Sequence, residues 1–502
     1  MAILLRIVLA VLTAAAFAIG RKLYSLWTLR RRLMALVPEP DKPDGFHGHF
    51  SKDLTKHRSQ LLSWVNRKPK ICRIQRGPIP MICIWHPETF SQLLAVDPPK
   101  FSYLFDFFKE FLGEGLTTSS GMRWKRDRKL LSPLFGGIML RRYIGDFTIV
   151  AKTMVEQLKA RCEAGELLDA EHVFHLVTFD IIMRTGMGVE VDSWDNNESS
   201  PVETFKQALK QLSIMSVTRL RTPTKHNNFL YYLTAEGKEY KRLLSHADEF
   251  ANRVVSDRRT VLANKEARVD DDMDRNETML DAIINARDED GHGFSDAEIR
   301  DHVKTFLEAG HDTSSTAMQW AVYYLQEHQD IQERCRQEIE TVLGNSGLEN
   351  VTIELLSKME YLMQFINETL RHASIFYALI RSIDRETEIG GYVLPANTPV
   401  QVMLFALHFN PEVWKDPEVF DPSRFSREQI ASRPLNSFFP FGIGARICIG
   451  KMFSINEIKV LLTSVLLNFR ILPRRPDQEK PKWVPKTVSR AEPSIKFELE
   501  AL

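Results

Sequence analysis

The sequence predicts a mainly α-helical protein with small β-sheets, an α+β fold, and three observations support this. A helical period dominates residues 120 to 380, and strand patterns are confined to the flanks, near residues 70–85 and 388–404. An apolar stretch lies within the first 22 residues. We therefore expect an N-terminal membrane anchor at residues 1–22, a basic and Pro/Gly-rich hinge at 23–50, and one large α-rich domain over 51–502.

The composition narrows the class of protein before any motif is considered. The chain has 502 residues, of which 44% are hydrophobic and 26% charged, which excludes wholesale disorder and a polytopic membrane protein. Lys and Arg number 66 against 65 Asp and Glu, so the net charge is only +1. A dedicated nucleic-acid binder needs a large basic excess, so no nucleic-acid partner is expected.

The orientation of the anchor follows from the charges around it. Residues 7–20 are apolar, with Arg6 before them and five basic residues after them: Arg21, Lys22, Arg30, Arg31 and Arg32. The positive-inside rule then leaves the rest of the chain in the cytoplasm. Two alternatives stay open, a cleaved signal peptide with a site near Ala16-Phe17-Ala18 and a helix that lies on the membrane surface.

Two hairpins and one aromatic loop are expected outside the helical region. Residues 70–76 and 79–85 predict a hairpin about Gly77-Pro78 that sets Cys72 opposite Cys83, as a disulfide or as two reduced thiols. Only five cysteines, an odd number, favour reduced thiols. Residues 388–404 predict a second hairpin, turned by Pro395-Ala396-Asn397. Residues 101–111 hold six aromatics, which suit core, a ligand-lining pocket wall or a membrane-facing loop.

One long helix is predicted with polar groups at its middle. Ser295 and Glu298 form a capping box, and the helical pattern continues to about His328. Gly310 would let the helix approach a flat ligand, and Thr313 can bond back to a preceding carbonyl and open a notch. Asp312 is a candidate proton source. Taken alone, an Asp-Thr pair in a helix is more often a surface pair or a local backbone bond.

A carboxylate and a guanidinium share a face of a later apolar helix. Glu368 and Arg371 lie three residues apart, which predicts a buried bidentate pair. An ordinary surface salt bridge is the alternative for an isolated pair of this spacing.

The strongest signal is the loop from Phe441 to Gly450, FGIGARICIG. Its glycines permit close approach of the backbone to a ligand, and a helical pattern resumes after Gly450. The Cys448 sulfur would then lie near a helix N-terminus and near Arg446, which favours a thiolate that can ligate a soft metal. A buried inert thiol is the alternative for a lone cysteine.

With these residues in view, the chain resembles the cytochrome P450 haem-thiolate monooxygenases over residues 40 to 495. The loop matches F-x-x-G-x-R-x-C-x-G at every fixed position. Four further family patterns occur in the family's order: W-x-x-x-R at 124–128, A-G-x-D-T at 309–313, E-x-x-R at 368–371 and P-x-R-F at 422–425. The resemblance implies the cytochrome P450 fold.

The resemblance also implies a role for each matching residue. Cys448 would ligate the iron of a haem b that is otherwise held non-covalently. The remaining haem-binding residues would be Trp124, Arg128, Arg381, Arg446, Phe441, Gly444 and Gly450. Asp312 and Thr313 would deliver protons to oxygen. Glu368, Arg371 and Arg424 would form a structural triad.

The implied activity is insertion of one oxygen atom from O2 into a C–H bond of a lipophilic substrate. Residues 112–116, 124–131 and 286–291 resemble the animal family 4 enzymes, which hydroxylate fatty acids at or near the ω carbon. Family 4 often carries Glu where Ala309 stands, so no covalent haem link is expected, and Ser374-Ile375 replaces the usual Pro-Pro. Alternatives are a monooxygenase of sterols, retinoids or xenobiotics, a haem-thiolate isomerase or lyase, and a haem sensor.

The implied partners follow from the absence of any flavin or nicotinamide motif in the chain. The resemblance implies NADPH–cytochrome P450 reductase, cytochrome b5 as a further candidate, and membrane lipid at the endoplasmic reticulum, with the catalytic domain on the cytoplasmic side. Four basic residues could dock the reductase: Lys125, Arg126, Lys129 and Lys451.

Overall fold

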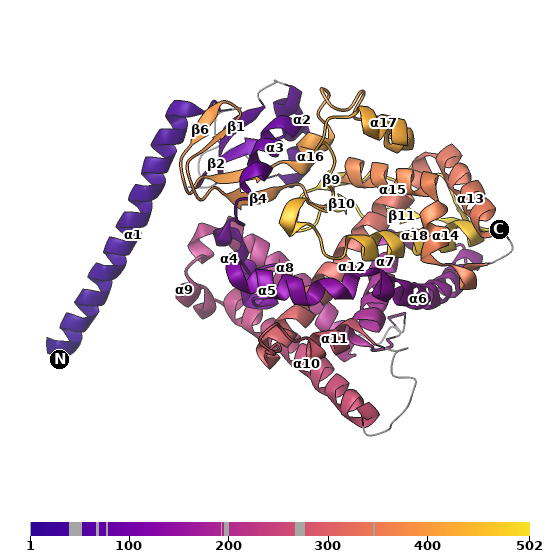
Figure 1. Ribbon diagram of the computed structural model, residues 1–502, viewed down its shortest axis with the longest axis horizontal. Helices are drawn as coiled ribbons and strands as arrows, with labels where there is room; N and C mark the ends of the chain where they lie inside the picture. The colour runs from indigo at the N-terminus through magenta and orange to yellow at the C-terminus, as the bar shows by residue number, and fades with distance from the viewer. Residues whose placement is uncertain are drawn as a thin grey trace. The chain divides into compact units, whose positions relative to one another are not determined.

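A computed structural model describes residues 2–39, 53–66, 70–76, 79–191, 193–194, 200–266, 277–344 and 347–502 (Figure 1). Most of these residues are helical and the strands are short, which confirms the predicted fold class. The chain forms two compact units. The first contains residues 1–101, 377–417 and 433–439, and the second contains 102–376, 418–432 and 440–502.

The first unit is built on a four-stranded sheet. Its strands lie in the order β1-β2-β7-β4, and β5 pairs with β6 beside it. Its elements are α1 (Ala2–Leu36), α2 (His57–Asn66), β1 (Ile71–Arg76), β2 (Ile79–Ile84), α3 (Pro87–Val96), β4 (Leu379–Ser382), β5 (Thr387–Ile389), β6 (Tyr392–Leu394), β7 (Pro399–Val402) and α16 (Leu404–His408).

The early hairpin is confirmed, because β1 and β2 pair with Cys72 opposite Cys83. Both cysteines are free and buried. The turn itself, Gly77-Pro78, lies outside the described residues.

The second hairpin was predicted wrongly: β5 and β6 turn at Gly390-Gly391, both with positive φ, and β7 instead pairs with β2 and β4. Two adjacent glycines permit the tighter turn, so Pro395-Ala396-Asn397 only connects β6 to the sheet.

The N-terminal segment differs from its prediction. α1 is one helix of 35 residues, so the expected hinge is helical up to Leu36, and residues 40–50 lie outside the described residues. Among the described residues, no helix combines the length and the apolar character needed to cross a membrane. The predicted anchor is therefore not confirmed.

The second unit is helical with two-stranded sheets. Its elements are α4 (Ser102–Leu112), α5 (Gly121–Leu131), α6 (Gly137–Glu163), β3 (Leu168–Asp169), α7 (Ala170–Ile182), α8 (Pro201–Arg221), α9 (Asn228–Leu233), α10 (Ala235–Glu266), α11 (Met279–Asn285), α12 (Asp296–Glu327), α13 (Gln329–Leu343), α14 (Ile353–Lys358), α15 (Glu360–Ala373), α17 (Arg427–Ser432), α18 (Lys451–Asn468), β8 (Phe469–Ile471), β9 (Lys482–Val484), β10 (Arg490–Glu492), β11 (Lys496–Phe497) and β12 (Leu499–Ala501). The aromatic run at 101–111 forms the helix α4 rather than a loop, because Phe107, Phe111 and Leu112 recur at helical spacing on its buried side.

The long helix α12 is the central element of this unit. Ser295 caps it, and the capping box with Glu298 is complete, as predicted. The missing side chain of Gly310 faces α7, and its expected approach to a flat ligand stays a prediction. A Cβ atom at this position would lie 2.9 Å from Cδ1 of Ile182, so the glycine lets α12 pack closely against α7.

We expect Gly310→Ala to destabilise the protein by about 1–2 kcal/mol, because overpacking against Ile182 outweighs the better helix propensity of alanine. The matched control is Gly145→Ala on α6, where a Cβ atom would meet nothing within 4 Å. Thermal unfolding should show a lower midpoint for the first variant and an equal or higher midpoint for the second. Equal midpoints for Gly310→Ala and the wild type would contradict the packing role.

Candidate haem-thiolate site

Helix α5 and the cysteine loop are joined by two arginines. Trp124 and Arg128 lie one turn apart on α5. The guanidinium of Arg446 stacks on the Trp124 ring at 3.6 Å from its centroid, and Arg128 Nη1 donates to the Ile447 carbonyl at 3.0 Å. Arg446 also donates to the Ser119 carbonyl at 3.2 Å. The structure thus brings Arg446 to Trp124 and Arg128, which lie more than 300 residues before it in the sequence.

The loop is shaped by glycines on the N-terminal side of Cys448. Gly442 and Gly444 have φ values of +71° and +74°, a region that favours glycine. The Cys448 amide then donates to the Phe441 carbonyl at 2.9 Å, which closes the loop. Gly450 is the N-cap of α18, with an ordinary φ of −84°, so it is not required for its backbone conformation.

Cys448 is a free cysteine with a solvent-exposed side chain, and its protein neighbours still desolvate the thiol in part. Burial raises the pKa of the thiol, and the Gly450 amide and the charges of Arg128 and Lys451 act in the opposite direction. The sequence had assigned that electrostatic role to Arg446, whose charge instead lies over Trp124. A bound metal ion would stabilise the thiolate directly. An accessible sulfur beside two guanidinium groups and an indole therefore fits a haem with anionic propionates.

Helix α12 presents a different chemistry on each side of its middle. Ala309 and Thr313 keep solvent access on a helix that is otherwise largely buried. The Thr313 hydroxyl donates to the Ala309 carbonyl at 2.9 Å, the backbone bond that the sequence suggested. Asp312 lies about 100° around the helix from Thr313 and is buried.

Asp312 is held by an ion pair that the sequence did not indicate. Its carboxylate accepts from Arg490 on β10, and its Oδ1 lies 3.5 Å from Nε2 of His175 on α7. Burial acts to raise the pKa of Asp312, but the charge of Arg490 and the neighbouring imidazoles His175 and His311 outweigh it and lower the pKa. In this structure Asp312 is therefore an ionised group that can accept a proton.

The buried polar triad is assembled. Arg371 donates to both carboxylate oxygens of Glu368 at 2.7 Å, and both side chains are fully buried. Arg424 places its Nε 3.5 Å from the same carboxylate, and the Asp421 amide donates to it at 2.8 Å. The pair is thus the buried bidentate one, and the surface alternative is wrong for Glu368 and Arg371.

Arg381 belongs to β4 of the first unit. It pairs across an isolated bridge with Lys100, and burial lowers the pKa of its guanidinium. Its expected contact with haem stays a prediction.

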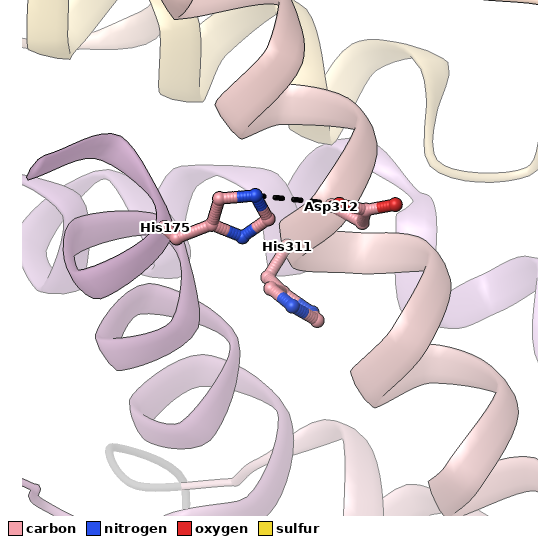
Figure 2. A group of neighbouring side chains, drawn as sticks. All are labelled: His175, His311 and Asp312. Carbon is pink, nitrogen blue, oxygen red and sulfur yellow. Dashed lines mark ion pairs between the residues drawn. The ribbon is translucent and has the colours of Figure 1, made fainter. Parts of the chain in front are cut away.

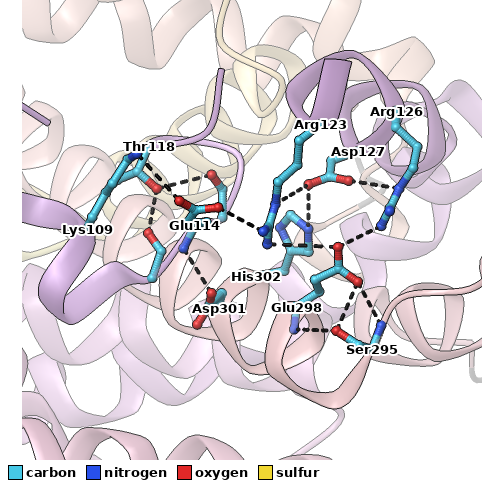
Figure 3. A network of polar contacts seen from close by, with 12 residues as sticks. Lys109, Glu114, Thr118, Arg123, Arg126, Asp127, Ser295, Glu298, Asp301 and His302 are labelled. Atoms are coloured by element: carbon cyan, nitrogen blue, oxygen red, sulfur yellow. Dashed lines mark hydrogen bonds and ion pairs between the residues drawn. The ribbon is translucent and has the colours of Figure 1, made fainter. Parts of the chain in front are cut away.

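The structure adds a buried pair that the sequence analysis missed (Figure 3). Asp127 on α5 and His302 on α12 are both fully buried, and His302 Nε2 lies 3.5 Å from Asp127 Oδ2. Arg126 flanks the carboxylate at 3.2 Å. This pair fixes the face of α5 that carries Trp124 and Arg128. The sequence signal that could have revealed this pair is Asp127, an acidic residue between Trp124 and Arg128.

Comparison with known proteins agrees with the site geometry. A family model for cytochrome P450 matches residues 38–499. The chain is 32% identical to cytochrome P450 4F6 of Rattus norvegicus, over 98% of this chain and 93% of that protein. It is 31% identical to cytochrome P450 4F2 of Homo sapiens, over 95% of this chain and 92% of that protein.

Among solved structures, the haem domain of cytochrome P450DA superposes with a TM-score of 0.80. It covers 93% of this chain and 98% of that chain at 22% identity, so the likeness concerns the fold.

We expect Arg371→Met to destabilise the protein by about 3–5 kcal/mol, because it leaves the Glu368 carboxylate buried without its bidentate partner. The matched control is Arg427→Met, which removes one side of an exposed pair with Glu360 and should change little. Chemical unfolding of both variants measures the difference. Comparable stability of the two would contradict a supporting role for the triad.

Proposed function

The chain belongs to the cytochrome P450 family, and from this premise we propose that it hydroxylates a fatty acid or an eicosanoid at or near the ω end. Membership makes the protein a monooxygenase, an oxidoreductase that carries haem b with cysteine thiolate ligation. The observation that carries the substrate proposal is the similarity to family 4 relatives at about 30% identity along nearly the whole chain.

One backbone feature sets this chain apart from the family pattern. Ser374, which stands where family 4 usually has proline, ends α15 with a φ of +37°. Proline fixes φ near −65° and cannot adopt this conformation. The chain therefore leaves α15 along a path that proline would forbid, and Ile375 then accepts a hydrogen bond from the Ser489 amide at 2.8 Å. This difference supports a pocket with its own regiochemistry.

We assign haem binding to the group around Cys448. A bound haem would supply the iron chemistry that activates oxygen, and the Cys448 thiolate would hold its iron. Trp124, Arg128 and Arg446 would bind and orient the propionates, and Arg381 is a further candidate. Phe441, Gly444 and Gly450 would contact the haem from the loop, where the positive φ of Gly444 also sets the backbone path. The methyl group at Ala309 offers no carboxylate, so the haem would be held without an ester link.

Two residues of α12 would handle protons. The overall reaction, in which O2, a C–H bond, two protons and two electrons give an alcohol and water, consumes protons at a site that must exclude bulk water. Thr313 would hold a proton at its hydroxyl, and Asp312 would replenish it. The ion pair to Arg490 keeps Asp312 available as the acceptor.

Electrons would come from NADPH–cytochrome P450 reductase, with cytochrome b5 as a further candidate donor. Of the four basic residues, Lys125, Lys129 and Lys451 are exposed. Arg126 and Lys129 already pair with Glu298 and Glu289. Lys125 and Lys451 are therefore the better candidates for docking an acidic partner surface.

We also propose that α1 attaches the enzyme to the endoplasmic reticulum membrane with the catalytic domain in the cytoplasm. The support is the apolar stretch at residues 7–20 followed by basic residues. A lipid-attached enzyme would meet its lipophilic substrate in the bilayer.

Replacement of Cys448 by Ala should abolish the haem-thiolate absorbance of the reduced, CO-bound protein, because no other sulfur would remain at the loop. Cys83→Ala, at a buried free cysteine in the first unit, is the matched control and should keep the absorbance. An unchanged spectrum for Cys448→Ala would show that the ligand lies elsewhere.

Product analysis tests the substrate class. The full chain is incubated with reductase, NADPH and a panel of fatty acids, eicosanoids, sterols and retinoids, and the products are identified by mass spectrometry. We expect hydroxylation at or near the fatty-acid terminus. Oxidation of the ring-bearing lipids alone would retain the monooxygenase chemistry and discard the fatty-acid proposal.

A further inference from the structure

A cluster of ionisable side chains lies between α7 and α12, outside the group around Cys448 (Figure 2). It contains His175, His311 and Asp312, and Arg490 closes it from β10. Arg490 places a positive charge directly on the Asp312 carboxylate, which disfavours a cation at this position. The cluster therefore suits proton transfer better than metal binding.

His175 faces two carboxylates with the same nitrogen. Its Nε2 lies 3.5 Å from Asp312 Oδ1 and 4.0 Å from Glu171 Oε1, one helical turn away on α7. Within the described part of the chain this nitrogen has no hydrogen-bond partner. Both distances slightly exceed a hydrogen bond, so a small ring rotation brings Nε2 to one carboxylate at a time.

Glu171 connects the cluster to solvent. Its side chain is 29% exposed and pairs with Lys210, whose own side chain is 62% exposed. Asp312 lies at the inner end of the row, next in sequence to Thr313. The three groups therefore form a row from the surface to the residue pair that the proposed function uses.

We propose that His175 is a relay residue that carries protons from Glu171 at the surface to Asp312. The Glu171 O–H bond breaks as the Nε2–H bond of His175 forms, and that bond breaks in turn as the Asp312 O–H bond forms. Bulk water reprotonates Glu171. Each turnover needs two passages, matching the two protons consumed with two electrons from the reductase.

The electrostatics of the row agree with this direction. Burial lowers the pKa of His175 to about 3, so the ring is neutral at rest and its Nε2 can accept a proton. The charge of Arg490 and the neighbouring imidazoles lower the pKa of Asp312, so its carboxylate is ionised and can accept a proton.

The test uses the full chain with reductase and compares His175→Gln and Glu171→Gln with the wild type. Glutamine keeps a polar side chain but cannot carry the proton. We expect the fraction of consumed oxygen that ends in product or water to fall about tenfold or more, with a matching rise in peroxide release. The solvent deuterium isotope effect on oxygen consumption should rise. Thr313→Ala is the uncoupled reference, and Arg427→Met, in an exposed pair outside the row, should behave like the wild type.

A second measurement separates relay from structure. Hydrogen peroxide brings its own protons, so peroxide-driven turnover should be unchanged in both glutamine variants. Equal loss of peroxide-driven turnover, or unchanged coupling and isotope effect, would overturn the relay.

The inference rests on the proposed proton-handling role of Asp312 and Thr313, but its readouts are independent of the substrate. Peroxide release and the isotope effect on oxygen consumption are measured whichever lipid is oxidised. Failure of the fatty-acid proposal is therefore distinguishable from failure of the relay.

Discussion

The second unit depends on the burial of one long helix that carries many polar side chains. α12 buries Asp301, His302, Lys304, His311 and Asp312 along with its apolar residues. A buried charge is costly unless it is paired, and the pairs that result tie α12 to neighbouring elements. His302 faces Asp127 on α5, and Asp312 binds Arg490 on β10. Lys304 donates to Asp248 on α10 at 2.6 Å.

The cysteine loop depends on the same constraint through α5. Asp127 and His302 hold α5 against α12, and on α5 the Trp124 indole supports Arg446 while Arg128 bonds the Ile447 carbonyl. The loop that presents Cys448 is thus supported from outside by arginines and from inside by its own backbone bond between Cys448 and Phe441. A preorganised ligand set of this kind reduces the cost of binding a rigid planar cofactor.

The two sides of α12 face different surroundings. Ala309 and Thr313 face accessible space, whereas Asp312 and His311 face α7. The close approach of α7, which Gly310 permits, is what brings His175 to Asp312. Gly310, which permits close packing of α12 and α7, therefore also determines which ionisable groups meet. The sequence suggested a ligand-facing role for this position, and the structure shows a packing role in the interior.

The sequence by itself determined the features that depend on neighbouring residues. These are the capping box and extent of α12, the Cys72–Cys83 register, the bidentate Glu368–Arg371 spacing and the glycine-framed loop ending at the N-terminus of α18. Each follows from hydrogen bonds or side-chain spacing within a few residues, or from a short hairpin. The tertiary structure alone decided the partners of Asp312, the Asp127–His302 pair, the place of β7 in the sheet and the surroundings of Gly310. Arg490 lies 178 residues from Asp312 along the chain, and only packing of the elements between them brings such groups together.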